Sequence, residues 1–171
     1  MNPIIVYRSE TGFTRQYALW LAQELGCEAV GWKDRRRVDW KAWDTVIYGG
    51  WFHAGGIRGL KWFGKQLLRL KGKRLAVFAV GACPVGDPGV ERALAANLSG
   101  PEWDGVARFY LRGGLCYKRM GVGDRLMMAA FRQMLRKKEG PDSETLRGVS
   151  RSFDALDRES IRPIVAWFKN E

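Results

Sequence analysis

The segment that most constrains this chain is residues 4–14, which read IIVYRSETGFT. Four apolar residues predict a buried strand, a polar loop containing a glycine follows, and a helical pattern of apolar residues then continues to Leu25. A strand, a short loop and a helix N-terminus together favour anion binding. The reason is that the first N–H groups of a helix lack intrahelical partners and the helix dipole attracts negative charge there.

The loop in this segment offers polar groups that carry no full charge. Ser9, Thr11 and Thr14 each supply a hydroxyl, and Gly12 lets the backbone close around an anion without a clashing Cβ. The same residues also suit an ordinary turn in which Thr14 caps the helix, so both interpretations stay open on these residues alone. Neither the triphosphate-binding pattern GxxxxGK[ST] nor a dinucleotide pattern GxGxxG after a strand occurs in the chain.

The composition favours one globular domain over residues 1–171. Hydrophobic residues make up 46% of the chain and charged residues 27%, which are ordinary values for a folded domain. No apolar run approaches the ~20 residues of a membrane span, and the N-terminus lacks the apolar core of a signal peptide. We therefore expect a cytoplasmic protein.

Few side chains in this chain suit metal or nucleophilic chemistry. The three cysteines are scattered and odd in number, which argues against a disulfide framework or a zinc site. The single histidine, His53, excludes a centre built from several histidines, and no GxSxG motif of a serine hydrolase is present. We expect no metal, and an organic cofactor would have to supply any redox reactivity.

Apolar runs recur in an alternating strand and helix rhythm. Asp87 and Pro88 are suited to begin a helix, and Ser160 is expected to cap the last helix so that Pro163 falls in its first turn. The predicted strands are 4–7, 27–32, 45–48, 75–80 and 106–111. The first predicted helix follows the first loop and ends near residue 25, and the others cover 60–68, 88–98 and 160–169. This rhythm predicts an α/β fold, a doubly wound three-layer sandwich around a five-stranded parallel sheet.

Between the fifth strand and the last helix lies an insert, residues 112–155, far longer than a crossover needs. Within it, 122–138 has an apolar helical stripe and a basic opposite face. The net charge of the whole chain is +11, which would attract anionic partners. The stripe therefore either packs on its own domain or makes a peripheral contact with the cytoplasmic face of an anionic membrane, and both alternatives stay open.

Three loops are the candidate ligand site, because ligands of doubly wound sheets bind at the carboxyl ends of the strands. They are residues 8–14, 49–57 and 81–88, whose glycines allow close backbone approach and whose aromatic rings could stack on a flat ligand. His53 is either a proton donor to a cofactor or an ordinary polar loop residue. The candidate residues are Ser9, Glu10, Thr11, Gly12, Phe13, Thr14, Gly49, Gly50, Trp51, Phe52, His53, Ala54, Gly55, Gly81, Ala82 and Cys83.

The Ser-x-Thr-Gly-x-Thr pattern of residues 9–14 resembles the FMN-phosphate loop of flavodoxins. Together with the segments 48–56 and 109–128, the chain resembles the flavodoxin-domain group that includes menaquinone-dependent protoporphyrinogen oxidases. The resemblance implies a flavodoxin-like strand order 2-1-3-4-5, FMN held by the three loops, and a long insert before the last helix. Arg8 and Arg15 depart from it, because flavodoxins hold the phosphate largely without cations.

This resemblance leaves three functions open. The first is an FMN-dependent oxidoreductase similar to the quinone-linked protoporphyrinogen oxidases. The second is a non-catalytic electron carrier, and the third is a binding module that has lost the flavin. We expect a redox partner protein or a quinone as the partner, and no nucleic acid.

Overall fold

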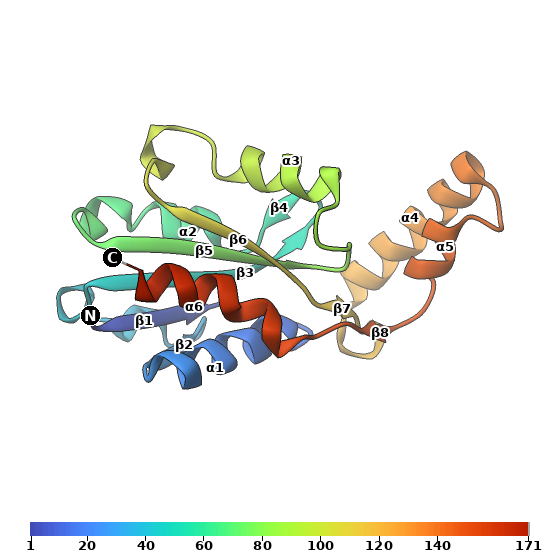
Figure 1. Ribbon diagram of the computed structural model, residues 1–171. Helices are drawn as coiled ribbons and strands as arrows, with labels where there is room; N and C mark the ends of the chain where they lie inside the picture. Colours follow the sequence, from blue (N-terminus) through green and yellow to red (C-terminus); the bar gives the residue numbers. More distant parts are fainter. Residues whose placement is uncertain (171) are drawn as a thin grey trace.

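Five parallel strands form the central sheet in the computed structural model, which describes residues 1–170 (Figure 1). The strands lie in the order β2-β1-β3-β5-β6, which is the predicted flavodoxin-like order. Their bounds are β1 (Pro3–Tyr7), β2 (Glu28–Gly31), β3 (Thr45–His53), β5 (Arg74–Gly81) and β6 (Ala107–Arg112). A short antiparallel strand, β4 (Gly56–Ile57), pairs with the end of β3.

Helices cover both faces of the sheet. On one face α1 (Phe13–Leu25) and α6 (Arg162–Lys169) pack against side chains such as Ile5 and Ile47. On the other face α2 (Leu60–Gly64) and α3 (Pro88–Asn97) pack against neighbours such as Ile4 and Val46. Successive residues of one strand thus enter opposite cores, which explains why the apolar runs are continuous rather than alternating.

Local signals placed one helix start correctly and another incorrectly. The Asp87 carboxylate accepts hydrogen bonds from the amides of Gly89 and Val90, which confirms the predicted cap of α3. In contrast, Ser160 does not cap the last helix. A 3-10 turn over Arg158–Ile161 precedes α6, and Asp157 caps that turn. Pro163 still lies in the first turn of α6, and the predicted inward side chains Ile164, Val165 and Phe168 are buried.

The third strand is longer than predicted. It was expected to end at Gly49–Gly50, but β3 continues to His53 and turns back into β4 through two residues. Ala54 and Gly55 both have positive φ values, 49° and 80°, as a two-residue hairpin of the I′ type requires. Most of the predicted second loop is therefore a hairpin.

The predicted helix over 60–68 is interrupted. It ends at Gly64, and a 3-10 turn over Leu67–Leu70 follows, which leaves Leu68 exposed. A Cβ at Gly64 would lie 3.3 Å from the Trp103 ring, so the chain approaches that ring closely where the helix ends. The remaining 3-10 turns are Arg35–Arg37, Trp40–Ala42, Pro101–Trp103 and Tyr117–Arg119.

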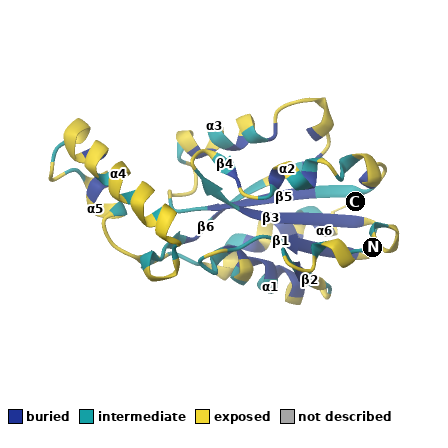
Figure 2. Ribbon diagram, turned by 180° about the vertical axis from the view of Figure 1, so that it is seen from behind, coloured by how far each residue is buried: buried dark blue, intermediate teal, exposed yellow. Residues whose placement is uncertain are grey.

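The insert forms an arm, residues 114–154, that extends beyond the carboxyl end of the sheet (Figure 1). The antiparallel strands β7 (Gly114–Leu115) and β8 (Phe153–Asp154) form its base, and the helices α4 (Val122–Glu139) and α5 (Glu144–Val149) form its body. The predicted helix over 122–138 is confirmed. Figure 2 shows that α4 is largely exposed, whereas the central strands β1, β3 and β5 are largely buried. Within residues 1–170, no helix combines the length and the apolar character needed to cross a membrane.

Candidate functional site

A cavity of about 360 Å³ lies at the carboxyl end of the sheet, where the three predicted loops meet. This volume is within the range of ligand sites in proteins, and apolar side chains dominate the walls. Eleven of the sixteen candidate residues line it: Glu10, Thr11, Phe13, Thr14, Trp51, Phe52, His53, Ala54, Gly81, Ala82 and Cys83. Residues far apart in the sequence are therefore brought together as the strand-end rule predicts.

The first loop leads directly into the N-terminus of α1. Gly12 has φ 102°, a left-handed conformation that favours glycine, and α1 begins at the next residue with no side-chain cap and no acidic residue in its first turn. The hydroxyl oxygen of Ser9 is buried and has no hydrogen-bond partner. Free helix N–H groups and an unpartnered buried hydroxyl are the donors that a phosphate group would accept from.

The other candidate residues that do not line the cavity have identifiable positions. Gly49 and Gly50 lie within β3 and are required by packing. A Cβ at Gly49 would lie 2.2 Å from the Phe78 ring, and one at Gly50 would lie 2.6 Å from the Arg58 carbonyl oxygen. Gly55 lies in the exposed hairpin turn.

The third loop is held by residues of β6. The Tyr110 hydroxyl donates a hydrogen bond to the Cys83 carbonyl oxygen at 2.8 Å, and Arg112 Nε donates to the Ala82 carbonyl oxygen at 3.3 Å. Although the residue is exposed, partial desolvation by the surrounding loop raises the pKa of the Cys83 thiol, and the nearby Asp87 carboxylate raises it further. The thiol on this wall of the cavity is therefore held in its neutral form.

The arm provides a fourth wall that the sequence did not predict. Asp124, Met127, Met128 and Phe131 line the cavity from α4, with Met120 before the helix. Their spacing of three, four and seven residues places them on one helical face. That spacing is visible in the sequence, but the partner of the face is not, because the other walls of the cavity come from three loops that are distant in the sequence.

Three polar contacts join the arm to the loops. His53 Nε2 and Asp124 Oδ1 are 2.7 Å apart, and both side chains are about four-fifths buried. The Gly121 amide donates to Glu10 Oε1 at 3.1 Å, and Arg119 Nη1 donates to the Thr11 carbonyl oxygen at 3.2 Å. Because each contact joins the arm to one of the predicted loops, the arm is fixed over the cavity at its base.

Of the two arginines noted in the sequence, Arg15 is exposed in the first turn of α1, and Arg8 does not contact the loop. Arg8 turns away from the loop, and its guanidinium lies 4.6 Å from the centre of the Trp32 ring. Arg119 of the arm approaches instead, because its Nη1 atom lies 3.0 Å from where a Cβ of Gly12 would be. Within residues 1–170 neither Arg8 nor Arg119 forms an ion pair with a carboxylate. Arg119 could therefore share a bound anion with the loop.

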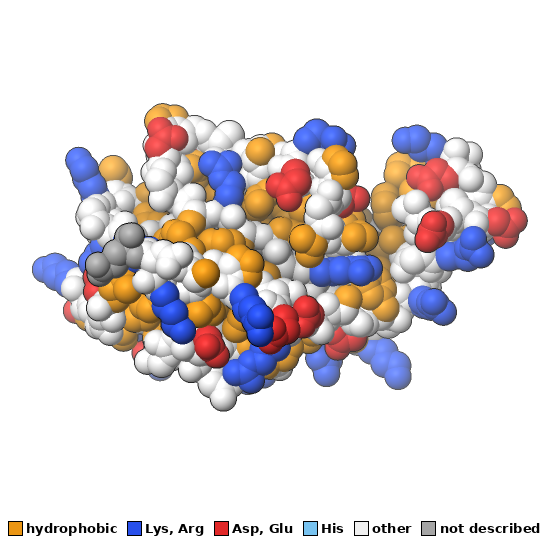
Figure 3. Space-filling view, in the orientation of Figure 1, with side chains coloured by type: hydrophobic (Ala, Val, Ile, Leu, Met, Phe, Trp, Pro, Cys, Tyr) orange, Lys and Arg blue, Asp and Glu red, His pale blue; other side chains and the backbone are white. Residues whose placement is uncertain are grey.

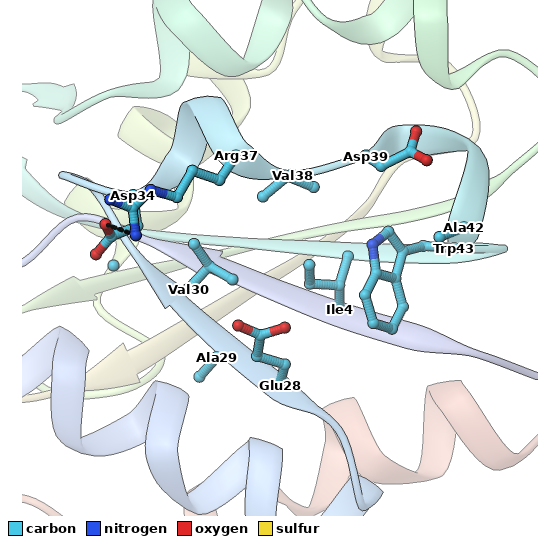
Figure 4. A pocket seen from close by; sticks show the side chains of 11 residues that line it. Ile4, Glu28, Ala29, Val30, Asp34, Arg37, Val38, Asp39, Ala42 and Trp43 are labelled. Carbon is cyan, nitrogen blue, oxygen red and sulfur yellow. Dashed lines mark ion pairs between the residues drawn. The ribbon is translucent and has the colours of Figure 1, made fainter.

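A second groove, of about 490 Å³, runs along the free edge of β2 and has a different character (Figure 4). Glu28, Asp34 and Asp39 line it, and Asp34 pairs with Arg37 at 3.3 Å. These carboxylates would repel a phosphate, and none of the three predicted loops reaches this groove. No group of three or more side chains suited to hold a metal ion occurs among residues 1–170.

Residues 4–142 match the family model described as the flavodoxin domain. This match covers most of the chain and includes the three loops and α4. The chain belongs to the flavodoxin domain family. No curated protein matches the chain significantly.

Solved structures with a similar fold include a WrbA-like flavodoxin from Agrobacterium tumefaciens. It is 20% identical, the match covers 80% of this chain and 98% of that one, and the TM-score is 0.49. A flavoprotein from Lactobacillus acidophilus, solved in complex with FMN, is 14% identical, with 65% and 92% covered and a TM-score of 0.41. The Trp repressor binding protein of Bacillus subtilis is 18% identical, with 64% and 82% covered and a TM-score of 0.41. The family assignment rests on the domain match.

Proposed function

We propose that this flavodoxin-domain protein binds FMN in the 360 Å³ cavity and acts as an oxidoreductase. The observation that carries the proposal is the first loop. An uncapped helix N-terminus, a left-handed glycine and an unpartnered buried hydroxyl belong to one short loop, and Thr11, Phe13 and Thr14 of this loop line the apolar cavity. A ligand with one phosphate and a flat apolar ring system fits this arrangement, and flavodoxins hold FMN with a loop of the same pattern.

The phosphate would be held by the loop and by the arm together. Ser9, Thr11 and Thr14 supply hydroxyl groups, and the first N–H groups of α1 supply backbone donors. Arg119 would add one charged donor from the arm. The ring system would lie between the walls of the cavity, with Trp51 and Phe52 on the side of the sheet and α4 on the side of the arm.

FMN would supply the capacity to exchange hydride or single electrons with a second substrate. The chain's own residues would exclude water from the ring and hold a proton nearby. His53 and Asp124 are the candidates for the proton, because their 2.7 Å contact lies in the cavity wall. Arg58 Nη2 lies 3.1 Å from the same His53 nitrogen.

The wall formed by the arm favours an enzyme over an electron carrier. A carrier needs only an exposed ring edge, whereas α4 adds methionine and phenylalanine side chains beside the ring site. These flexible apolar side chains suit a flat apolar second substrate such as a quinone. We therefore keep a quinone-linked reaction similar to that of protoporphyrinogen oxidases as the more specific proposal, and electron transfer to a partner protein as the alternative.

The identity of the cofactor is the first test. The flavin released from the purified protein should be FMN, because the chain has one phosphate loop and no dinucleotide motif. FAD, or a protein that neither carries nor takes up flavin, would contradict the proposal. Mass analysis of the released flavin and titration of the apoprotein with FMN provide the answer.

The position of the phosphate is the second test. Thr11→Ala, Thr14→Ala and Arg119→Gln should each weaken FMN binding about ten- to a hundredfold, since each removes one charge-assisted hydrogen bond worth roughly 1.5–3 kcal/mol. Arg15→Gln is the matched control, because Arg15 is exposed beside the same loop and its loss removes the same charge. If all four variants bound FMN with the dissociation constant of the wild type, the phosphate would have to lie elsewhere.

The enzyme and the carrier differ in how they depend on Asp124. Reoxidation of the reduced, FMN-loaded protein by a soluble quinone should slow in Asp124→Asn, while the rate with a one-electron acceptor such as ferricyanide should change little. A carrier would show equal rates in the variant and the wild type with both acceptors.

A further inference from the structure

Helix α4 has a second apolar row that does not line the cavity. Leu126, Ala130 and Met134 are spaced four residues apart, so they lie on one face of the helix. None of them contributes to the cavity wall, and Leu126 and Met134 are 67% and 50% exposed. Exposed apolar side chains in a row, rather than scattered singly, indicate a surface that another molecule covers.

Basic side chains accompany this row. Lys137 and Lys138 follow Met134 by three and four residues, which places them on either side of it one turn further along. Arg125, Arg132 and Arg136 belong to the same helix, and within the described part of the chain no carboxylate forms an ion pair with any of these five. Figure 3 shows basic and hydrophobic side chains on the arm, with acidic side chains among them.

We propose that this face of the arm binds an anionic lipid surface. Leu126, Ala130 and Met134 would enter the boundary between headgroups and acyl chains, and Lys137 and Lys138 would contact the anionic headgroups. The arm is suited to this because it extends from the sheet and carries little of the core. On α4 only Leu135 is buried.

Charge complementarity selects the lipid surface over a second copy of the chain. Two copies meeting through this face would bring together two chains that each carry a net charge of +11, and this repulsion opposes pairing. An acidic protein shares the charge of the lipid surface, and the experiment below separates the two.

The apolar row continues towards the cavity. Met127 and Phe131 line the cavity and are also 36% and 38% exposed, so they connect its wall with the face formed by Leu126 and Met134. A bilayer on this face would therefore lie beside the opening of the cavity. The proposal itself does not depend on flavin binding, because the row and the lysines lie outside the cavity wall.

Flotation of the full-length protein with vesicles tests the proposal. We expect binding to vesicles that contain phosphatidylserine, no binding to phosphatidylcholine alone, and a decline in binding as salt screens the headgroups. Replacing Arg136, Lys137 and Lys138 by Gln should weaken binding by roughly a hundredfold, at about fivefold for each cation. Replacing Leu126 and Met134 by Ser should weaken it about tenfold or more.

Matched controls come from the main body of the molecule. Replacing Lys61, Lys65 and Arg69 by Gln removes the same charge at exposed positions far along the chain from the arm, and Leu68→Ser removes an apolar side chain that is 90% exposed. Both controls should float like the wild type. Melting curves and FMN titrations of all variants should be unchanged, since none of the substituted residues lines the cavity.

Three results would overturn the proposal. The first is the absence of flotation at low salt. The second is equal weakening by the arm variants and the body controls, which would mean that binding follows net charge alone. The third is flotation that is unaffected by Leu126→Ser and Met134→Ser, which would mean that charge alone attracts the arm to lipid and that the apolar row takes no part in binding.

Discussion

The sheet and the arm use apolar residues in opposite ways. On α1, a helix of the main body, Tyr17, Ala18 and Leu21 are fully buried against the sheet. On α4, a longer helix, only Leu135 is buried, and five large apolar side chains are at least one third exposed: Val122, Leu126, Met127, Phe131 and Met134. Figure 2 shows the same contrast. An amphipathic pattern therefore predicts that a helix forms, but does not reveal what its apolar face contacts.

The difference also separates the roles of the two regions. The main body supplies three loops at the carboxyl ends of its strands, as the parallel sheet requires. The arm adds a fourth wall and three polar contacts, none of which stabilises the sheet directly. We therefore expect substitutions in the buried core of the body to change stability, and substitutions in the loops or in the arm to change binding.

The largest expected difference is between two leucines on helices. Leu21→Ala should lower the free energy of unfolding by about 2–5 kcal/mol, because it removes a fully buried side chain and leaves a cavity. Leu126→Ala should change it by less than about 0.5 kcal/mol, because the side chain is 67% exposed. Urea denaturation of both variants measures the difference, and a comparable loss in Leu126→Ala would mean that the arm belongs to the core.

Replacing each of two glycines by alanine should change the stability of the protein in opposite directions. Gly49→Ala should destabilise the protein by about 1–3 kcal/mol, because the new Cβ would meet the Phe78 ring at 2.2 Å. Gly123→Ala should stabilise α4 by up to about 1 kcal/mol, because Gly123 lies within the helix with open space around it. Thermal unfolding tests the first, and slower amide exchange in α4 tests the second. Destabilisation by Gly123→Ala would indicate a neighbour at that position.

The contact between His53 and Asp124 should hold the two regions together. Asp124→Ala removes a charge-assisted hydrogen bond worth about 1.5 kcal/mol, so amides of α4 should exchange about tenfold faster. Amides of β3 and β5 should keep their protection, because the sheet does not need the arm. Equal acceleration in the sheet would contradict the separation of the two regions.

The smallest expected effect on stability comes from the ionisation of a thiol in the main body, that of Cys27. Burial, together with the neighbouring Glu28 carboxylate, raises the pKa of Cys27 to about 11. Only the thiolate reacts with iodoacetamide, so the rate at Cys27 should rise about tenfold for each pH unit from 7 to 10 without a plateau. The same raised pKa makes the folded protein less stable as pH rises through this range, because the unfolded thiol loses its proton first. Mass spectrometry of the labelled peptides measures the rate at Cys27. A plateau in the rate near pH 8 or 9 would show that the thiol is exposed.

Features that depend on neighbouring residues in the chain were predictable. The continuous run of residues 75–80 indicated a strand covered on both faces, and Asp87 with Pro88 indicated the start of α3. The loops followed from the rule for parallel strands. The continuation of β3 to His53 was missed, because glycines at 49 and 50 suggest a loop, whereas here they make room for the Phe78 ring and for the β4 hairpin.

Features that depend on distant residues were not predictable. The apolar face of α4 was visible, but its contact with the cavity depends on the pairing of Asp124 with His53 across the molecule. Arg119 was missed for the same reason, since its approach to Gly12 spans more than a hundred positions. No local pattern marks such contacts.

The central claim is that the arm completes a flavin site begun by the main body. Titration of the apoprotein with FMN, followed by the quenching of flavin fluorescence, tests it most directly. Trp51→Ala in the wall of the body and Phe131→Ala in the wall of the arm should each raise the dissociation constant by about tenfold or more, and each should restore part of the fluorescence. Met134→Ala, on the same helix but outside the cavity, should bind FMN like the wild type. Weakening by Trp51→Ala alone, with Phe131→Ala indistinguishable from Met134→Ala, would contradict the claim.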